Sequence, residues 1–255
     1  MLRYARMRKL IRLTDAISML ITATRRITDI EYVSHREALG RVLSGDITAP
    51  TDIPPYHRAA MDGYAVISED TVGASPDSPR TLKLVGESNI GSPYEGGISR
   101  GEAVYVHTGS MIPMGADAVI PLEYTEARGE RVLIFKAVAP WENISRRGED
   151  VARGDAVLRL GTILEPFDVA IIKALGIKRI PVFRRPRISV VAVGSELVDQ
   201  AEDLGPGKLI EYSREIVLGA ARMYGCEVSD LGIVSDDMSE LEEAILGGLE
   251  ASDIL

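Results

Sequence analysis

Cysteine is almost absent from this chain, and its scarcity removes several classes of site. Cys226 is the only cysteine among 255 residues. A disulfide framework, a thiolate zinc site and a redox pair each need more than one cysteine, so the sequence offers none of them. The three histidines, His35, His57 and His107, lie far apart without the spacing of metal ligands. We expect them to be structural or solvent-facing.

Long apolar runs are also lacking. No stretch approaches the ~18 apolar residues of a membrane span. The basic N-terminus is followed by an apolar stretch that Arg12 and Asp15 interrupt, which argues against a signal peptide. Aromatic residues are only 5% of the chain although hydrophobic residues are 45%, so the core must rest on aliphatic side chains. We expect a soluble, cytoplasmic protein with no membrane partner.

Excess positive charge and several familiar motifs are missing as well. The net charge is −9, opposite to what a general nucleic-acid binder needs to neutralise phosphates. The sequence has no G-x-x-x-x-G-K-[ST], H-E-x-x-H, C-x-x-C or G-x-S-x-G segment. A generic Rossmann nucleotide-binding protein is disfavoured too, because no G-x-G-x-x-G follows the apolar run 188–193.

The N-terminal region carries helix signals. Apolar residues recur on one helical face over 13–21, with Thr14 as the expected N-cap. Ser34 and Glu37 have capping-box spacing, and Gly40 can end the short helix that follows them. Residues 156–183 then predict a short strand, a helix over 166–175 and a strand after Gly176.

Two further regions differ from the N-terminal region in the spacing of their apolar residues. Over 82–136, short apolar runs at 82–85, 103–106, 118–122 and 132–135 alternate with glycine-bearing turns, which predicts a β-rich domain. From 188 onward the pattern is strand, helix, strand, helix, strand, typical of a doubly wound parallel sheet. So few strands would leave exposed edges, and the sequence ends as a strand begins at 253–255. We therefore expect a truncated chain.

Three loop segments are candidates for function, each with a simpler alternative. Asp62-Gly63 is a turn signal, so Asp62 could cap a tight turn. Thr108 and Ser110 could donate to an oxyanion, or form an ordinary hydroxyl-capped turn. The segment 146–150, Arg-Arg-Gly-Glu-Asp, could bind a metal and phosphate, or could be a salt-bridged surface loop.

A fourth candidate lies at a sheet edge. Glu196 follows the expected strand 188–193, and ligands of doubly wound folds bind at the carboxyl ends of strands. Asp62, Asp150 and Glu196 are thus three loop carboxylates near glycines. Mg²⁺ prefers oxygen ligands and often takes one or two carboxylates together with substrate phosphates, so these acids are candidate metal ligands.

The order of these motifs resembles the molybdopterin molybdenumtransferase family, which includes MoeA and the gephyrin E domain. The matching segments run over nearly the whole chain: Glu37-Ala-Leu-Gly-Arg-Val-Leu43, Met61-Asp-Gly-Tyr-Ala65, Thr108-Gly109, Gly115-Ala-Asp-Ala-Val119, Arg147-Gly-Glu-Asp150 and Gly194-Ser-Glu-Leu197. Each motif is weak alone, whereas their succession is specific.

The resemblance implies an α/β multidomain fold. An elongated, discontinuous scaffold domain is expected over 1–48 and 138–185, with a small β-rich domain inserted at 49–137. Residues 186–255 are expected to form the N-terminal part of a doubly wound molybdopterin-binding α/β domain, cut at Leu255. The remainder of that domain and a C-terminal barrel would be missing.

The resemblance also implies an activity in molybdenum cofactor biosynthesis. Family members insert metal from molybdate, or tungstate, into adenylated molybdopterin and release AMP with Mg²⁺. They act as homodimers whose cleft the partner subunit completes, and the molybdopterin adenylyltransferase is a further expected partner. The 255 residues alone are expected to be inactive because much of the substrate site would be missing.

Residue roles follow from the matched motifs. The resemblance implies catalytic roles for Asp62, Thr108, Asp150 and Glu196, with Asp62, Asp150 and Glu196 as Mg²⁺ ligands. Arg147, Ser195 and Glu211 are the expected substrate-binding residues.

Two departures from the family pattern favour a second hypothesis. The family's T-G-D-E-L is Val-Gly-Ser-Glu-Leu at 193–197, and its D-[ST]-N is Glu-Tyr-Ser at 211–213. The family's later S-G-G-x-S loop lies beyond Leu255. A non-catalytic dimeric scaffold, or a pseudoenzyme fragment of the same fold, is therefore the alternative.

Overall fold

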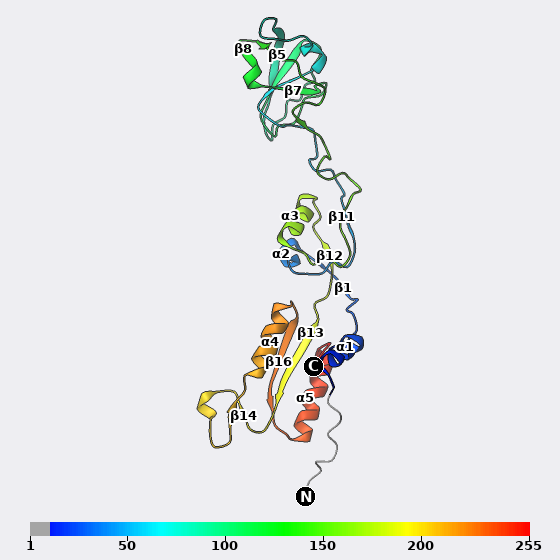
Figure 1. The fold of residues 1–255 in the computed structure, drawn as a ribbon, viewed down its shortest axis with the longest axis vertical. Helices are drawn as coiled ribbons and strands as arrows, with labels where there is room; N and C mark the ends of the chain where they lie inside the picture. The colour runs from blue at the N-terminus through cyan, green and yellow to red at the C-terminus, as the bar shows by residue number, and fades with distance from the viewer. Residues whose placement is uncertain (1–10) are drawn as a thin grey trace. The chain divides into compact units, whose positions relative to one another are not determined.

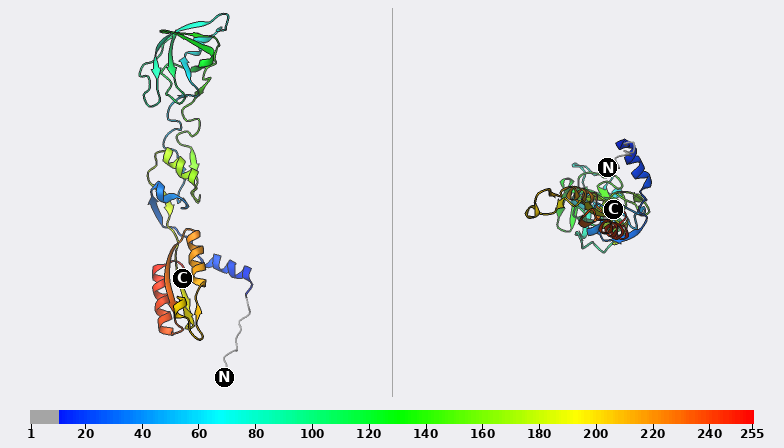
Figure 2. Two further views of the ribbon diagram at one scale, coloured as in Figure 1. Left: turned by 90° about the vertical axis from the view of Figure 1, so that its left-hand side faces the viewer. Right: turned by 90° about the horizontal axis from the view of Figure 1, so that it is seen from below.

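The computed structural model describes residues 11–255, which form two compact units (Figures 1 and 2). The α/β unit contains residues 11–45, 161–165 and 179–255, and the sheet unit contains 46–160 and 166–178. Each unit is assembled from segments that are far apart in the sequence.

A six-stranded sheet dominates the sheet unit, in the order β7-β4-β6-β5-β9-β8. Its strands are β4 (Gly63–Val66), β5 (Arg80–Ser88), β6 (Glu102–Val106), β7 (Ala118–Pro121), β8 (Thr125–Arg128) and β9 (Arg131–Ile134). The β5–β6 pair is parallel and the other pairs are antiparallel. Alternate residues feed two apolar clusters, since Tyr64 and Val66 join one and Ala65 the other. β4 is thus buried on both faces, although it lies next to the edge strand β7.

Shorter elements complete the sheet unit. They are β2 (Ile47–Thr48), β3 (Arg58–Ala59), β10 (Ile144–Ser145), β11 (Ala156–Leu158), α3 (Pro166–Ala174) and the 3₁₀ turns η1 (Ser68–Thr71) and η2 (Leu122–Tyr124). β3 pairs antiparallel with β10, and β2 with β11. The β3–β10 pair brings two segments with predicted functional residues side by side.

The α/β unit begins with α1 (Leu13–Ala23), β1 (Ile30–Val33) and α2 (His35–Ala38), and β1 pairs antiparallel with β12 (Ile180–Phe183). The predicted capping box at the start of α2 is confirmed, because the backbone N–H of Ser34 donates to Glu37 Oε2 at 3.0 Å. Gly40 has φ 71°, a left-handed conformation that glycine adopts without steric cost.

The rest of the α/β unit is the start of a doubly wound sheet. It comprises β13 (Arg187–Val193), β14 (Leu197–Val198), the 3₁₀ turn η3 (Ala201–Asp203), β15 (Leu209–Ile210), α4 (Ser213–Met223), β16 (Glu227–Val234) and α5 (Met238–Ala251). β13 and β16 are parallel, and Ile254 bridges Ile188 in parallel on the other side of β13. The chain thus adds β16 on one side of β13 and residue 254 on the other. This order places the two connecting helices, α4 and α5, on opposite faces of the sheet (Figures 1 and 2). The expected α/β class is confirmed.

Two local predictions were wrong. The N-cap of α1 is Arg12, not Thr14, and no side chain caps that end. Thr14 lies inside the first turn, where its hydroxyl is 3.5 Å from Asp15 Oδ1. The segment after Asp62 is not a tight turn, because Gly63 opens the buried strand β4. The predicted domain boundaries at 48/49, 137/138 and 185/186 stay predictions.

Candidate functional site

Asp62 and Thr108 form a direct pair in the sheet unit. Asp62 precedes β4 and Thr108 follows the neighbouring β6. Asp62 Oδ1 accepts hydrogen bonds from the Thr108 backbone N–H at 2.6 Å and from Thr108 Oγ1 at 2.7 Å. Both residues are exposed. The structure therefore brings together two of the predicted catalytic residues, 46 positions apart in the chain.

These bonds keep Asp62 ionised. The Thr108 backbone N–H, followed by the Thr108 hydroxyl, lowers the pKa of Asp62 below its ordinary value, because both donors stabilise the carboxylate. Within residues 11–255, Oδ2 of Asp62 accepts no hydrogen bond. The site thus presents one occupied and one available carboxylate oxygen.

The turn that carries Thr108 explains this geometry. The Ser110 backbone N–H donates to the His107 carbonyl at 2.8 Å, and Gly109 has φ 87°, as the third position of a type II turn requires. The Thr108 hydroxyl donates to Asp62 and not within its own turn. Ser110 is only 1% exposed, so its hydroxyl is not at the surface. The alternative of an ordinary turn capped by the Thr108 or Ser110 hydroxyl is therefore wrong.

Gly63 positions Asp62 through close packing. A Cβ atom at Gly63 would lie 2.0 Å from the Ile120 carbonyl oxygen, closer than any side chain can approach. β4 and β7 pair at this point, with Gly63 opposite Pro121. Glycine is thus required for the strand that carries Asp62, which explains the Asp-Gly pair without a turn.

The predicted loop 146–150 uses one of its acids internally. Glu149 accepts hydrogen bonds from the Ser145 hydroxyl and from the Arg146 backbone N–H, the latter at 2.7 Å. These donors, Ser145 first, lower the pKa of Glu149. Gly148 has φ 73°. Glu149 therefore shapes the loop, and Asp150 and the two arginines remain for other partners.

Arg147 and Asp150 pair outside the loop and not with one another. Arg147 Nε donates to Asp52 Oδ2 at 2.5 Å, and Asp150 Oδ2 lies 3.8 Å from Arg58 Nη2. The Arg153 backbone N–H, and then Arg147, lower the pKa of Asp52. The loop is thus salt-bridged at the surface, as the simpler hypothesis has it, but its ion pairs are made with Asp52 and Arg58 and not within the loop.

Ser195 and Glu196 lie at the carboxyl end of β13 in the α/β unit. The Ser195 backbone N–H donates to Asp236 Oδ2 at 2.9 Å, and the Asp236 backbone N–H donates to Ser195 Oγ at 3.0 Å. The Ser195 backbone N–H, and then the Ser195 side chain, lower the pKa of Asp236 by stabilising its carboxylate. Glu196 is exposed, and its carboxylate lies so close to Gly194 that a Cβ there would be 2.7 Å from Oε2. The Ser195 hydroxyl is therefore engaged in joining β13 to the end of β16.

Glu211 lies beside a cavity of about 510 Å³ at the same edge, between β13 and the start of α4. Its side chain is 4% exposed. Oε1 accepts the Arg214 backbone N–H at 2.9 Å, and Oε2 lies 4.0 Å from Arg214 Nε. The buried Arg214 also pairs with Asp199 at 2.5 Å and Asp230 at 3.1 Å. Glu211 thus accepts a backbone hydrogen bond from the first turn of α4, and it also lines the cavity.

Comparison with known proteins decides the family. A family model described as the MoeA N-terminal region, domains I and II, matches residues 11–176. The chain belongs to the MoeA family. A MoeA molybdopterin biosynthesis protein from Pyrococcus horikoshii OT3, known from its crystal structure, has a TM-score of 0.89 and 38% sequence identity, covering 96% of this chain and 66% of that chain.

Curated MoeA-type relatives agree. A Haemophilus influenzae molybdopterin molybdenumtransferase is 34% identical over 229 residues, which are 89% of this chain and 55% of that protein. A Methanocaldococcus jannaschii protein named for molybdopterin biosynthesis is 35% identical over 249 residues, 94% of this chain and 60% of that protein. The chain thus spans between half and two thirds of these relatives' lengths.

The MoeA residues do not form a complete metal site within either unit. No group of three or more His, Cys, Asp or Glu side chains is arranged to hold a metal ion in the described part of the chain, residues 11–255. Asp62 and Asp150 lie in the sheet unit and Glu196 in the α/β unit. The three-carboxylate Mg²⁺ site therefore stays a prediction.

Several residues of these sites were not identified from the sequence. Asp236 follows β16 as Glu196 follows β13, so the same rule about carboxyl ends of strands could have found it. Asp52 and Arg58 carried no such signal, because their roles arise from pairing with a segment about 90 residues away.

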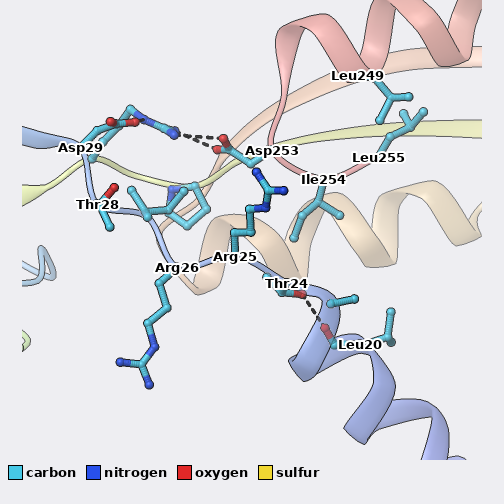
Figure 3. A pocket seen from close by; sticks show the side chains of 14 residues that line it. Leu20, Thr24, Arg25, Arg26, Thr28, Asp29, Leu249, Asp253, Ile254 and Leu255 are labelled. Atoms are coloured by element: carbon cyan, nitrogen blue, oxygen red, sulfur yellow. Dashed lines mark hydrogen bonds and ion pairs between the residues drawn. The ribbon is translucent and has the colours of Figure 1, made fainter.

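A second cavity of the MoeA chain, about 650 Å³, lies apart from all predicted site residues (Figure 3). It is lined by the segment after α1 and by Asp253 to Leu255, and Asp253 there pairs with Arg184 at 2.8 Å.

None of the helices within residues 11–255 is long and apolar enough to cross a membrane.

Proposed function

We propose that this protein acts in molybdenum cofactor biosynthesis, inserting metal from molybdate or tungstate into adenylated molybdopterin with release of AMP. The observation that carries the proposal is the Asp62–Thr108 pair, since two motifs shared with the family meet through two hydrogen bonds. Relatives at 34–35% identity over 88–89% of the chain are named molybdopterin molybdenumtransferase.

The proposed roles follow from charge and exposure. Asp62, held ionised by Thr108, would accept a hydrogen bond from the substrate at its available oxygen. Arg147 would bind phosphate, because a guanidinium pairs well with phosphate oxygens. Asp150 and Glu196 are proposed as further catalytic carboxylates, and Ser195 and Glu211 as substrate-binding residues.

We also propose that the reaction depends on Mg²⁺, which would offset negative charge on the departing AMP. Asp62, Asp150 and Glu196 are the proposed ligands. Because neither unit alone holds three converging ligands, no step of the mechanism is assigned to the metal. Loss of AMP release after chelation, restored by added Mg²⁺, is the expected result.

A homodimer and a cytoplasmic location are proposed as well, with the molybdopterin adenylyltransferase as a partner that supplies the substrate. α1 supports self-association, since it buries no residue and exposes Leu13 at 77% and Leu20 at 67%. Sedimentation velocity of the purified protein would give twice the monomer mass if the dimer forms.

The alternative is a dimeric scaffold without catalysis. It is favoured by Ser195, which stands where the family has an acid and whose hydroxyl is taken by Asp236. Complementation separates the two functions. We expect the protein, extended to the full length of its MoeA relatives, to restore molybdoenzyme activity in a host that lacks its own molybdenumtransferase, and Asp62→Asn in the same protein to fail. If neither the wild-type protein nor Asp62→Asn complements the host, although both form the dimer, the scaffold is favoured.

A further inference from the structure

Trp141, the only tryptophan of the chain, has an unusual backbone conformation. Its φ is 67°, in the left-handed region that bulky residues rarely adopt. The Glu142 backbone N–H donates to the Ala139 carbonyl at 3.1 Å, so Trp141 is the third residue of a turn with Pro140 second. A proline at the second position and a residue with positive φ at the third are typical of a type II turn. Glycine or asparagine normally occupies that third position.

The indole lies within the candidate site of the sheet unit. Arg146 Cζ is 4.8 Å from the Trp141 ring centroid. The His57 ring is 5.0 Å away at 53°, and its Nδ1 accepts the Arg147 backbone N–H at 3.0 Å. Trp141 remains 38% exposed. A large aromatic surface is thus presented next to two arginines of the loop 146–150.

Packing alone does not explain this residue. Two other cation–aromatic pairs occur within residues 11–255, Lys136 with Tyr124 at 4.6 Å and Arg179 with Tyr32 at 5.8 Å. Neither aromatic residue has positive φ. Strained backbone conformations cluster at functional sites, and glycine would form this turn without strain. The backbone N–H of Arg146 donates to Glu149 Oε2 at 2.7 Å, while its guanidinium lies over the indole ring.

We propose that Trp141 is a stacking platform for a planar heteroaromatic ring that carries a phosphate. The ring would replace the Arg146 guanidinium on the indole, and Arg146 would then pair with the phosphate beside Arg147. Stacking on an aromatic side chain suits any such ring, because each has a π face. The inference rests on the proposed function only for the ring's identity, adenine or pterin, both of which adenylated molybdopterin contains.

Intrinsic fluorescence tests the proposal on the full chain, since every tryptophan photon comes from Trp141. Titration with AMP or with a phosphorylated pterin should quench the emission saturably, whereas ribose 5-phosphate, which has no aromatic ring, should not. Whichever ring quenches is the occupant. Saturable quenching by neither ring would overturn the proposal.

Calorimetric titration of variants with the quenching ring gives the second readout. Trp141→Gly should weaken binding about tenfold and keep or raise Tm, because glycine adopts positive φ freely. Tyr124→Ala, which removes the matched aromatic–cation pair, should bind as the wild type does. Should Trp141→Gly unfold, Trp141→Asn, tolerant of the same backbone, replaces it. Affinity within twofold of wild type in the folded variant would contradict the platform. Binding is measured without turnover, so failure of the enzymatic function would leave this result standing.

Discussion

At the residue scale, Asp62 shows how a distant residue sets the chemistry of a carboxylate. Its sequence neighbours suggested a self-capped turn, yet both donors that lower its pKa come from Thr108. Part of this could be predicted, since both residues lie in motifs that resemble one family. Their contact could not, because it depends on β4 and β6 lying adjacent in the sheet.

Thr108 should therefore control the ionisation of Asp62. Thr108→Val removes the hydroxyl donor and leaves the backbone donor, so the pKa of Asp62 should rise part of the way toward its ordinary value. Thr108→Ser keeps the hydroxyl and should leave the pKa low. Carboxyl ¹³C chemical shifts followed against pH measure both variants. An unchanged pKa in Thr108→Val would show that the hydroxyl bond contributes nothing.

At the element scale, β4 is one of the strands that sequence patterns missed. Its four residues are all buried, but the Asp-Gly dipeptide before it indicated a turn. The need for glycine comes from the carbonyl of Ile120 across the sheet, which no local pattern encodes. By contrast, the α2 capping box was predictable because Ser34 and Glu37 are only three residues apart.

Gly63→Ala should test this packing. The added methyl group would force β4 away from β7, and we expect a loss of about 1–3 kcal/mol or more in unfolding free energy. Gly45→Ala is the control, since nothing lies within 4 Å of its Cβ position and its φ is not left-handed. It should change stability by less than about 0.5 kcal/mol. Urea denaturation compares the two, and equal stabilities would contradict the close approach.

Asp253 gives an element-scale prediction for pH. Arg184, and then the Arg187 backbone N–H, lower the pKa of Asp253 to about 2, which ties residues 253–254 to β13. Because the folded pKa is depressed, its stabilisation is complete above the ordinary value and is lost as pH falls toward about 2. Asp253→Asn should therefore unfold with a weaker pH dependence between about pH 4 and 2. An unchanged acid titration of stability would refute the tie.

At the scale of the whole molecule, the predicted residues divide between the two units. Asp62, Thr108, Arg147 and Asp150 lie in the sheet unit, and Ser195, Glu196 and Glu211 lie in the α/β unit. Motif order predicted the family, and strand order predicted the doubly wound sheet. The partners Asp52 and Arg58 emerged only from the fold, because each contacts a segment far away in sequence.

The most direct test of the proposed function is AMP release from adenylated molybdopterin with molybdate and Mg²⁺ by the purified protein, extended to the full length of its MoeA relatives because the 255 residues alone are expected to be inactive. We predict release by the wild type, a reduction of at least about 100-fold in Asp62→Asn, and wild-type release by Glu95→Gln, an equal charge change at an exposed residue of the same unit. Release that Asp62→Asn leaves intact, or no release by a folded wild-type protein, would contradict the proposal.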